Sequence, residues 1–318
     1  LDFPDMFGAS APQTNNASMR NRGWELSLNW RGKIGNDINY SVGGSLSDAT
    51  AEVTEYANPT GTNPAGNWYV GRKVGEIWGY RAEGIIQTQA EADEYNKYDL
   101  SYLSGKAWEP GDVKYVDLNG DKAINRGKNT LEDMGDMTII GNTTPRYQYT
   151  FNGSISWKDL SLSMMFQGVG KRDWDPGTAP YFWGSGAYAQ VTVFNEHMDY
   201  WREDNPNAYY PKPYIHSAGG VTPFRNKIMQ TSDRYLQSGA YCRLKNITLS
   251  YNLPSSWTQR VGLQKVQVFF SGENLLTFTS LKGMFDPEAI FTGNSYTSEG
   301  GKNYPMNKVV SFGLVVNL

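Results

Sequence analysis

The segment 117–121 carries oxygen-bearing side chains at its first, third and fifth positions. Calcium binds such a spacing, because alternate carboxylate and amide oxygens can converge on one cation. An EF-hand loop continues with glycine and later glutamate, whereas this chain has Lys122 and Lys128 at those places. The alternative is a turn in which these side chains accept backbone hydrogen bonds. The candidate ligands for Ca²⁺ are Asp117, Asn119 and Asp121, with a more distant carboxylate from Glu132, Asp133 or Asp136. No activity that we expect of the chain requires this cofactor.

Aromatic residues are the second candidate for binding, because their flat rings can stack on a sugar ring or on a peptide. Six of the ten tryptophans lie in two long segments, 47–145 and 169–239. The aromatic side chains of these segments must pack against other residues or against a partner, because large exposed apolar patches are uncommon. Most of these rings are expected to form small cores within their own segments. The candidates for contact with a substrate or a covering protein are Trp68, Trp78, Trp174, Trp183, Trp201, Tyr209 and Tyr210.

No arrangement of residues predicts catalysis, so we do not expect an enzyme. The two histidines, His197 and His216, have no cysteine near them, and no G-x-S-x-G motif is present. Cys242 is the single cysteine, which excludes an internal disulfide framework. A surface glycoside hydrolase would need a positioned pair of carboxylic acids, and no spacing in the chain indicates one.

The composition of the 318 residues excludes two classes of protein. The net charge of −3 provides no basic surface for nucleic acid. The mean hydropathy is −0.56, and no apolar run approaches the 18 or more residues of a membrane-spanning helix. A membrane β-barrel is still allowed, because each of its strands is apolar on one face only.

Apolar and polar residues alternate along seven segments, which predicts β-strands with one apolar and one polar face. The polar faces carry Ser, Asn, Gln and Thr, and aromatic residues lie near the strand ends. Both features favour a membrane barrel, with aromatic girdles at the lipid interfaces, over a soluble β-sandwich. The expected strands are 23–33, 38–46, 146–157, 160–167, 246–253, 266–276 and 306–318.

The connections between these segments alternate between short and long. Outer-membrane barrels have short periplasmic turns and long extracellular loops, so the long connections are expected outside the cell. A short helix within 88–98 is expected to begin at Thr88, with Glu91 completing a capping box. The expected turns are 33–36, 158–159 and 254–263, and the expected extracellular loops are 1–22, 47–145, 169–239 and 278–305.

Seven strands cannot close a barrel, since bacterial single-chain barrels have an even number of at least about eight. An open sheet would leave two unpaired strand edges in lipid, where unsatisfied backbone groups are costly. We therefore expect the chain to be part of a larger barrel. Its first and last strands should then show long, unpaired edges or pair with another chain.

Six motifs, in family order over nearly the whole chain, resemble those of SusC/RagA-type TonB-dependent transporters of Bacteroidota. They are 20–28 (RNRGWELSL), 79–87 (GYRAEGIIQ), 111–121 (GDVKYVDLNGD), 140–147 (IGNTTPRY), 243–251 (RLKNITLSY) and 271–277 (SGENLLT). The chain departs from the family at Leu318, where an aromatic residue is common, and at Lys122, where glycine is common.

This resemblance implies an all-β fold: residues 1–318 would be the C-terminal part of a transmembrane barrel of about 22 strands, without its plug domain and earlier strands. It implies TonB-dependent import of oligosaccharides or peptides across the outer membrane, with a SusD-like lipoprotein over the extracellular mouth. The expected partners are that lipoprotein, TonB through the missing N-terminal part, the glycan or peptide substrate and outer-membrane lipid, but no nucleic acid. The alternative is a soluble, secreted glycan-binding β-protein that uses the same aromatic residues.

Overall fold

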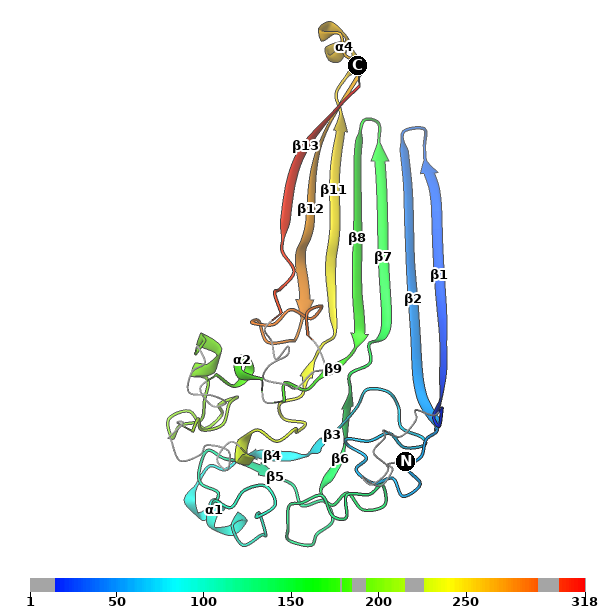
Figure 1. Cartoon of the computed structure of the whole chain (residues 1–318). Helices are drawn as coiled ribbons and strands as arrows, with labels where there is room; N and C mark the ends of the chain where they lie inside the picture. Colours follow the sequence, from blue (N-terminus) through cyan, green and yellow to red (C-terminus); the bar gives the residue numbers. More distant parts are fainter. Residues whose placement is uncertain (1–14, 178, 185–192, 215–225, 291–302, 318) are drawn as a thin grey trace, which may run out of the picture.

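Seven long strands form one antiparallel sheet in the order β1-β2-β7-β8-β11-β12-β13 (Figure 1). The structure is a computed structural model that describes residues 15–177, 179–184, 193–214, 226–290 and 303–317. This sheet confirms the expected all-β class and all seven expected strands. The strands are β1 (Ser18–Ile34), β2 (Ile38–Glu55), β7 (Arg146–Trp157), β8 (Leu160–Lys171), β11 (Tyr241–Asn252), β12 (Lys265–Thr279) and β13 (Val309–Asn317).

The strand register gathers the apolar residues on one face of the sheet. Directly paired residues lie on the same face, so each register gives a row of side chains that crosses the strands. Most of these apolar side chains are exposed or half-buried rather than packed in a core; Phe312, for example, is 81% exposed. One such row consists of Tyr40, Ile155, Leu162, Leu249, Phe270 and Phe312. The expected division into an apolar and a polar face is therefore confirmed.

The sheet is open at both edges. Among the described residues, β1 pairs only with β2, and β13 pairs only with β12. These are the two long, unpaired strand edges that the odd number of strands predicts. An apolar sheet cannot leave such edges in lipid, because each unpaired backbone group there costs several kcal/mol.

The two longest connections fold together into a compact layer at one end of the sheet (Figure 1), here called the loop body and defined by the described residues of 56–145 and 172–240. It contains three small two-stranded sheets: β3 (Glu76–Tyr80) with β6 (Met137–Asn142), β4 (Ala82–Ile85) with β5 (Val113–Tyr115), and β9 (Asp173–Trp174) with β10 (Gln237–Ser238). Its helices include α1 (Gln89–Tyr95), α2 (Pro180–Trp183) and the 3₁₀ turn η3 (Asn195–Met198).

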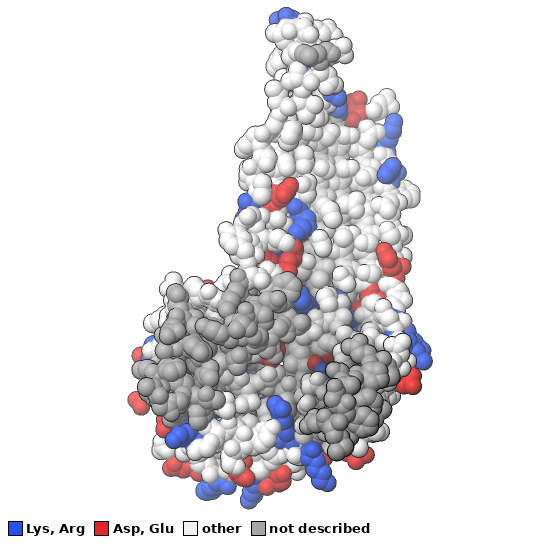
Figure 2. All heavy atoms as spheres, in the orientation of Figure 1, with Lys and Arg blue, Asp and Glu red and all other residues white. Residues whose placement is uncertain are grey.

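At the opposite end of the sheet, α4 (Ser255–Thr258) and η4 (Gln259–Val261) connect β11 to β12, in the short connection that the sequence predicts. No helix among the described residues is long and apolar enough to span a membrane. Lys, Arg, Asp and Glu gather over the loop body and near the strand ends, and most of the sheet surface between them is uncharged in Figure 2.

Several expected boundaries are wrong: β11 begins at Tyr241 rather than at 246, β12 runs on to Thr279, and β13 begins at Val309 rather than at 306. Residues 18–22 and 47–55 belong to β1 and β2 rather than to loops, because backbone pairing between these strands continues beyond the apolar alternation, as far as Ser18 and Glu55. Strand β8 likewise runs on to Lys171. Helix α1 does begin after Thr88, whose hydroxyl accepts from the backbone N–H of Glu91. The Glu91 carboxylate, however, accepts from the N–H of Gln87 rather than from that of Thr88, so the capping box is not formed.

Gly168 of β8 lies where a side chain would collide with fixed atoms. The Tyr149 hydroxyl passes over it and donates to the carbonyl oxygen of Tyr241. A Cβ at position 168 would lie 2.3 Å from that carbonyl oxygen and 2.4 Å from the Tyr149 ring. We expect Gly168→Ala to lower the free energy of unfolding by about 1–3 kcal/mol, the usual cost of overpacking.

Gly153 of β7 provides the matched control. It lies on the same face of the sheet, and a Cβ there would have its nearest neighbour at 3.9 Å. Gly153→Ala should therefore leave stability nearly unchanged. Urea unfolding of both variants in lipid vesicles measures the difference, and equal effects would contradict the close contact at Gly168.

Candidate functional site

The polar face of the sheet carries hydroxyl groups from one edge to the other. A single row runs across all seven strands through Arg31, Ser41, Ser154, Ser163, Thr248, Ser271 and Ser311. Two hydrogen bonds link neighbouring strands on this face: Ser41 to Ser154 at 3.0 Å and Ser45 to Thr150 at 2.7 Å. The face is therefore hydrophilic but contains few charges.

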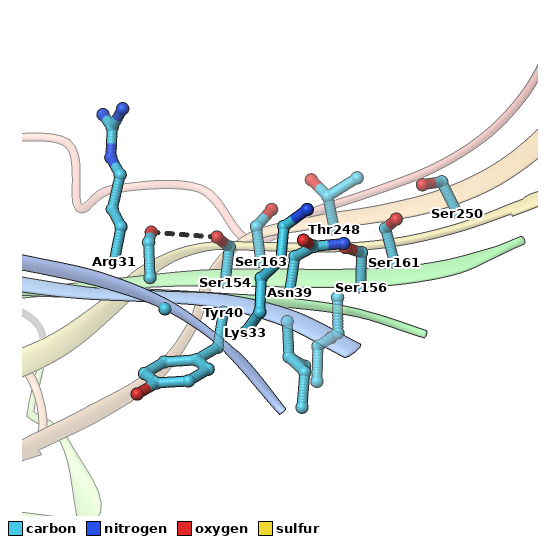
Figure 3. Close-up of a pocket in the computed structure, with 14 residues that line it drawn as sticks. Arg31, Lys33, Asn39, Tyr40, Ser154, Ser156, Ser161, Ser163, Thr248 and Ser250 are labelled. Carbon is cyan, nitrogen blue, oxygen red and sulfur yellow. Dashed lines mark hydrogen bonds between the residues drawn. The ribbon is translucent and has the colours of Figure 1, made fainter. Parts of the chain in front are cut away.

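The part of this face nearest the short turns forms a hollow of about 690 Å³. In Figure 3, the serine and threonine side chains project from one side of the sheet, whereas Tyr40 projects from the other. Arg31 and Lys33 of β1 add positive charge at one margin of the hollow. Hydroxyls both donate and accept hydrogen bonds, so this surface can hold water or a polar chain without selecting one charge. Such chemistry is suited to the wall of a water-filled lumen.

Most of the aromatic candidates are buried in the core of the loop body. Phe182 of α2 is fully buried, and its ring centroid lies 5.0 Å from that of Trp183 and 5.6 Å from that of Tyr210. Four candidates are buried in the structure: Trp174, Trp183, Trp201 and Tyr210. Rings packed in this way stabilise the loop body and are not free to stack on a ligand in this conformation.

The three other aromatic candidates are more accessible. Tyr209 and Trp78 are half-buried, and Trp68 is 38% exposed. The Arg72 guanidinium lies over the Trp68 ring, 5.0 Å from its centroid, which holds the ring in place by a cation–π contact. Trp68 is therefore the candidate whose ring is best placed to meet a ligand or a partner.

The candidate calcium loop forms a tight turn. Asp117 accepts hydrogen bonds from the backbone N–H groups of Gly120 and Lys122, at 2.7 and 2.9 Å. Asp121 accepts from the N–H of Ala123 and from the side-chain amide of Asn119. These contacts are those of the Asx-rich turn that is the alternative, and calcium binding by this segment stays a prediction. Within the described ranges, no group of three His, Cys, Asp or Glu side chains could hold a metal ion.

Asp136, one of the more distant carboxylates, lies beneath this turn. It is fully buried and accepts from the N–H groups of Leu118 and Asn125. Burial raises the pKa of the Asp136 carboxyl, while these two N–H groups oppose the rise and nearby Asp117 and Asp121 add to it. Its contacts fix both ends of the turn, which is a structural role. Of the two histidines, His197 is buried beside Tyr210, and His216 lies outside the described residues.

A buried ion pair, not predicted from the sequence, joins distant parts of the loop body. The Lys227 ammonium donates to Asp112 at 2.6 Å and to the carbonyl oxygen of Ala107 at 2.8 Å, and both charged side chains are fully buried. The Tyr214 hydroxyl donates to the other oxygen of Asp112. Burial and the Asp112 carboxylate raise the pKa of Tyr214, which keeps it protonated as a donor. The pair is 115 residues apart in the sequence, so no local spacing indicates it.

A second charged cluster joins β11 to the segment that follows β12. Arg243 lies 2.8 Å from Asp286 and 3.2 Å from Glu288, and Lys245 lies 3.0 Å from Glu288. Leu281, Phe285 and Ile290 of the same segment are buried in the core of the loop body. The cluster therefore attaches this segment to the sheet and to the loop body.

The chain is similar over nearly its whole length to TonB-dependent receptors. It is 28% identical to TonB-dependent receptor P3 of Formosa agariphila, over 92% of the chain and 27% of that receptor. It is 25% identical to TonB-dependent receptor P26 of the same organism, over 99% of the chain and 31% of that receptor. The resemblance to TonB-dependent receptors of the SusC/RagA type is confirmed. No protein-family model matches the chain.

Solved structures support the same fold. The RagAB peptide transporter superposes with a TM-score of 0.62 and 23% identity, over 99% of this chain and 31% of that one. The RagAB peptide importer in its "open-open" state gives a TM-score of 0.64, also at 23% identity. The chain spans less than a third of the TonB-dependent receptors and transporter chains that it matches. Its sheet thus has the fold of a barrel fragment of a TonB-dependent receptor.

Proposed function

We propose that this chain forms part of the barrel wall and the extracellular loops of an outer-membrane importer. The observation that carries the proposal is the seven-stranded sheet with one apolar and one hydroxyl-rich face, found in a chain similar to TonB-dependent receptors. The apolar face would contact lipid, and the hydroxyl-rich face would line the lumen. On this proposal, residues 1–318 are the C-terminal part of the barrel, and the chain has no enzymatic activity.

The partners and the cargo are part of the same proposal. The cargo is an oligosaccharide or a peptide, and import is powered through TonB, which acts on other parts of the complete receptor. A SusD-like lipoprotein covers the loop body, where the exposed ring of Trp68 is the candidate for contact with it or with cargo. The structural likeness to a protein described as a peptide transporter keeps peptide as a candidate alongside glycan.

Growth of a strain that lacks the complete receptor gene tests this function. We expect the strain to lose growth on one oligosaccharide or one peptide mixture as sole nutrient, while growth on glucose is unchanged. Reintroducing the gene should restore growth, and removing TonB should abolish it again. Wild-type growth of the deletion strain on every oligosaccharide and peptide tested would contradict a role in nutrient import.

The exposed apolar face argues against the alternative of a soluble glycan-binding protein. Trp24, Leu28, Trp30 and Phe312 are each at least half exposed on the sheet. Contiguous apolar surface of this extent marks contact with a membrane or another protein. A folded monomer purified without detergent would favour the soluble alternative.

The proposed topology predicts where protease cuts intact cells. The loop body should be accessible from outside, whereas the turn at 158–159 should lie on the periplasmic side. Protease treatment followed by mass spectrometry should find cleavage at exposed sites such as Lys97 in the loop body. Cleavage at Lys158 in intact cells, with the loop body spared, would reverse the orientation.

A further inference from the structure

A cavity of about 530 Å³ lies where β2, β7 and β8 meet the loop body. Its walls are the ends of these strands, the segment 73–76 that enters β3, and the connection from β6 to β7. Hydrogen bonds hold the walls together: the backbone N–H of Val74 donates to the carbonyl oxygen of Ala51, and the side chains of Asn142 and Thr144 donate to the carbonyl oxygen of Val74. The cavity is therefore formed by regular strands and by the segment 73–76, which these hydrogen bonds hold in place.

The acidic groups of this cavity are occupied by donors of the protein itself. Glu76 accepts from the Tyr69 hydroxyl at 2.6 Å and from the backbone N–H of Lys73 at 2.9 Å. Asp173 accepts from the backbone N–H of Asn142 at 2.8 Å. These contacts leave the two carboxylates with less capacity to attract a cation.

Two of the three basic groups in this cavity are not paired in the same way. Arg146 is paired through two of its nitrogens with Asp48. In the part of the chain that the structure describes, the ammonium groups of Lys73 and Lys171 make no hydrogen bond and no ion pair, and both residues are exposed. The cavity thus presents two uncommitted cationic donors beside carboxylates that are already hydrogen-bonded.

We infer that this cavity binds an anionic group, a carboxylate or a sulfate, with Lys73 and Lys171 as its cationic contacts. Its volume lies within the range of small-molecule sites, which is about 300–1,000 Å³. Ammonium groups bind such anions by charge-assisted hydrogen bonds, which are stronger than neutral ones. The inference rests on the proposed import function only where it assigns the anionic group to the imported cargo. On that proposal, the cargo carries a negative charge. A uronic or sulfated sugar and the C-terminus of a peptide share this chemistry.

Binding of matched small probes to the complete purified receptor in detergent tests the site without any transport. D-glucuronate is compared with D-glucose, and N-acetylglycine with N-acetylglycinamide, by isothermal titration calorimetry. We expect at least one anion of the two pairs to bind and its neutral counterpart not to bind, with affinity falling as salt rises. Binding of glucuronate alone indicates a sugar acid, and binding of N-acetylglycine alone indicates a peptide carboxylate. Equal behaviour of acid and neutral probe in both pairs would overturn the inference.

Two substitutions locate the binding. Lys73→Gln and Lys171→Gln should each weaken anion binding about fivefold or more, since a lost charge-assisted contact is worth of this order. Lys265→Gln, an exposed lysine at the opposite end of the sheet, is the matched control and should leave affinity unchanged. Unchanged affinity in both cavity variants would place the anion elsewhere and refute the site. The two proposals can fail separately. Wild-type growth of the deletion strain together with selective anion binding would refute the import function alone, whereas loss of growth together with equal behaviour of acid and neutral probes would refute this site alone.

Discussion

Replacing Asp112 with alanine should lower the free energy of unfolding of the loop body by about 3–5 kcal/mol. The substitution leaves the fully buried Lys227 ammonium without its carboxylate and removes the acceptor of the Tyr214 hydroxyl. A buried charge that loses its partner cannot be solvated, which makes the effect far larger than that of a surface pair. Hydrogen exchange of the loop body, measured by mass spectrometry on the receptor in detergent, reports the change directly.

An exposed pair at the C-terminal end of α1 supplies the control. Lys97 and Glu94 form an ion pair in which the side chains are 68% and 70% exposed. Glu94→Ala should therefore change stability by no more than about 0.5 kcal/mol. The double variant Asp112→Ala with Lys227→Met should recover much of the loss, because no buried charge remains. An Asp112→Ala loop body with wild-type exchange would show that the buried pair does not stabilise it.

Arginine at Met164 is expected to have the second large effect. Met164 lies on the apolar face of β8, paired with Gly153 and Ile247, and midway among the outward-facing positions 160–168. An arginine facing lipid near the bilayer midplane costs about 2–4 kcal/mol. Met164→Arg should therefore lower both the stability of the receptor in lipid vesicles and its amount in the outer membrane.

Met165 is the matched control, because it is the same residue type one position further along the strand. It lies on the hydroxyl-rich face, paired with Asn152 and Asn246, where an arginine can reach water. Met165→Arg should cost much less than Met164→Arg in urea unfolding. Equal costs, or a larger cost at Met165, would mean that the two faces have been assigned to the wrong environments.

The strands could be predicted from the sequence because, in an amphipathic strand, the residue type at each position indicates which face of the sheet the side chain lies on. In β7, Tyr149 and Phe151 are apolar and Asn152 and Ser154 are polar, and these types correspond to the two faces of the sheet. The pattern fails where neither face is strongly apolar. At 47–55, the pairing of β2 with β1 is held by backbone hydrogen bonds, which small and charged side chains neither require nor prevent.

The interior of the loop body could not be predicted in the same way, because its contacts join residues far apart in the chain. Aromatic content indicated that Trp174 and Trp183 must pack, but not that α2 would bring Phe182 to the centre of the cluster. The Asp112–Lys227 pair likewise depends on the fold of two separate segments. The segment 117–121 shows a related limit, since the same oxygen spacing serves a turn or a cation.

Labelling of two adjacent positions in β7 tests the two-faced membrane wall most directly. Cysteine is introduced singly at Phe151 or Asn152 in a complete receptor in which Cys242 is serine, and each variant is reconstituted in lipid vesicles. Collision of a spin label at each cysteine is then measured with oxygen, which concentrates in lipid, and with a water-soluble nickel chelate. The account predicts that the label at 151 meets oxygen and is shielded from the chelate, and that the label at 152 shows the opposite preference. Equal access of both labels to oxygen would contradict a lipid-facing and a lumen-facing side.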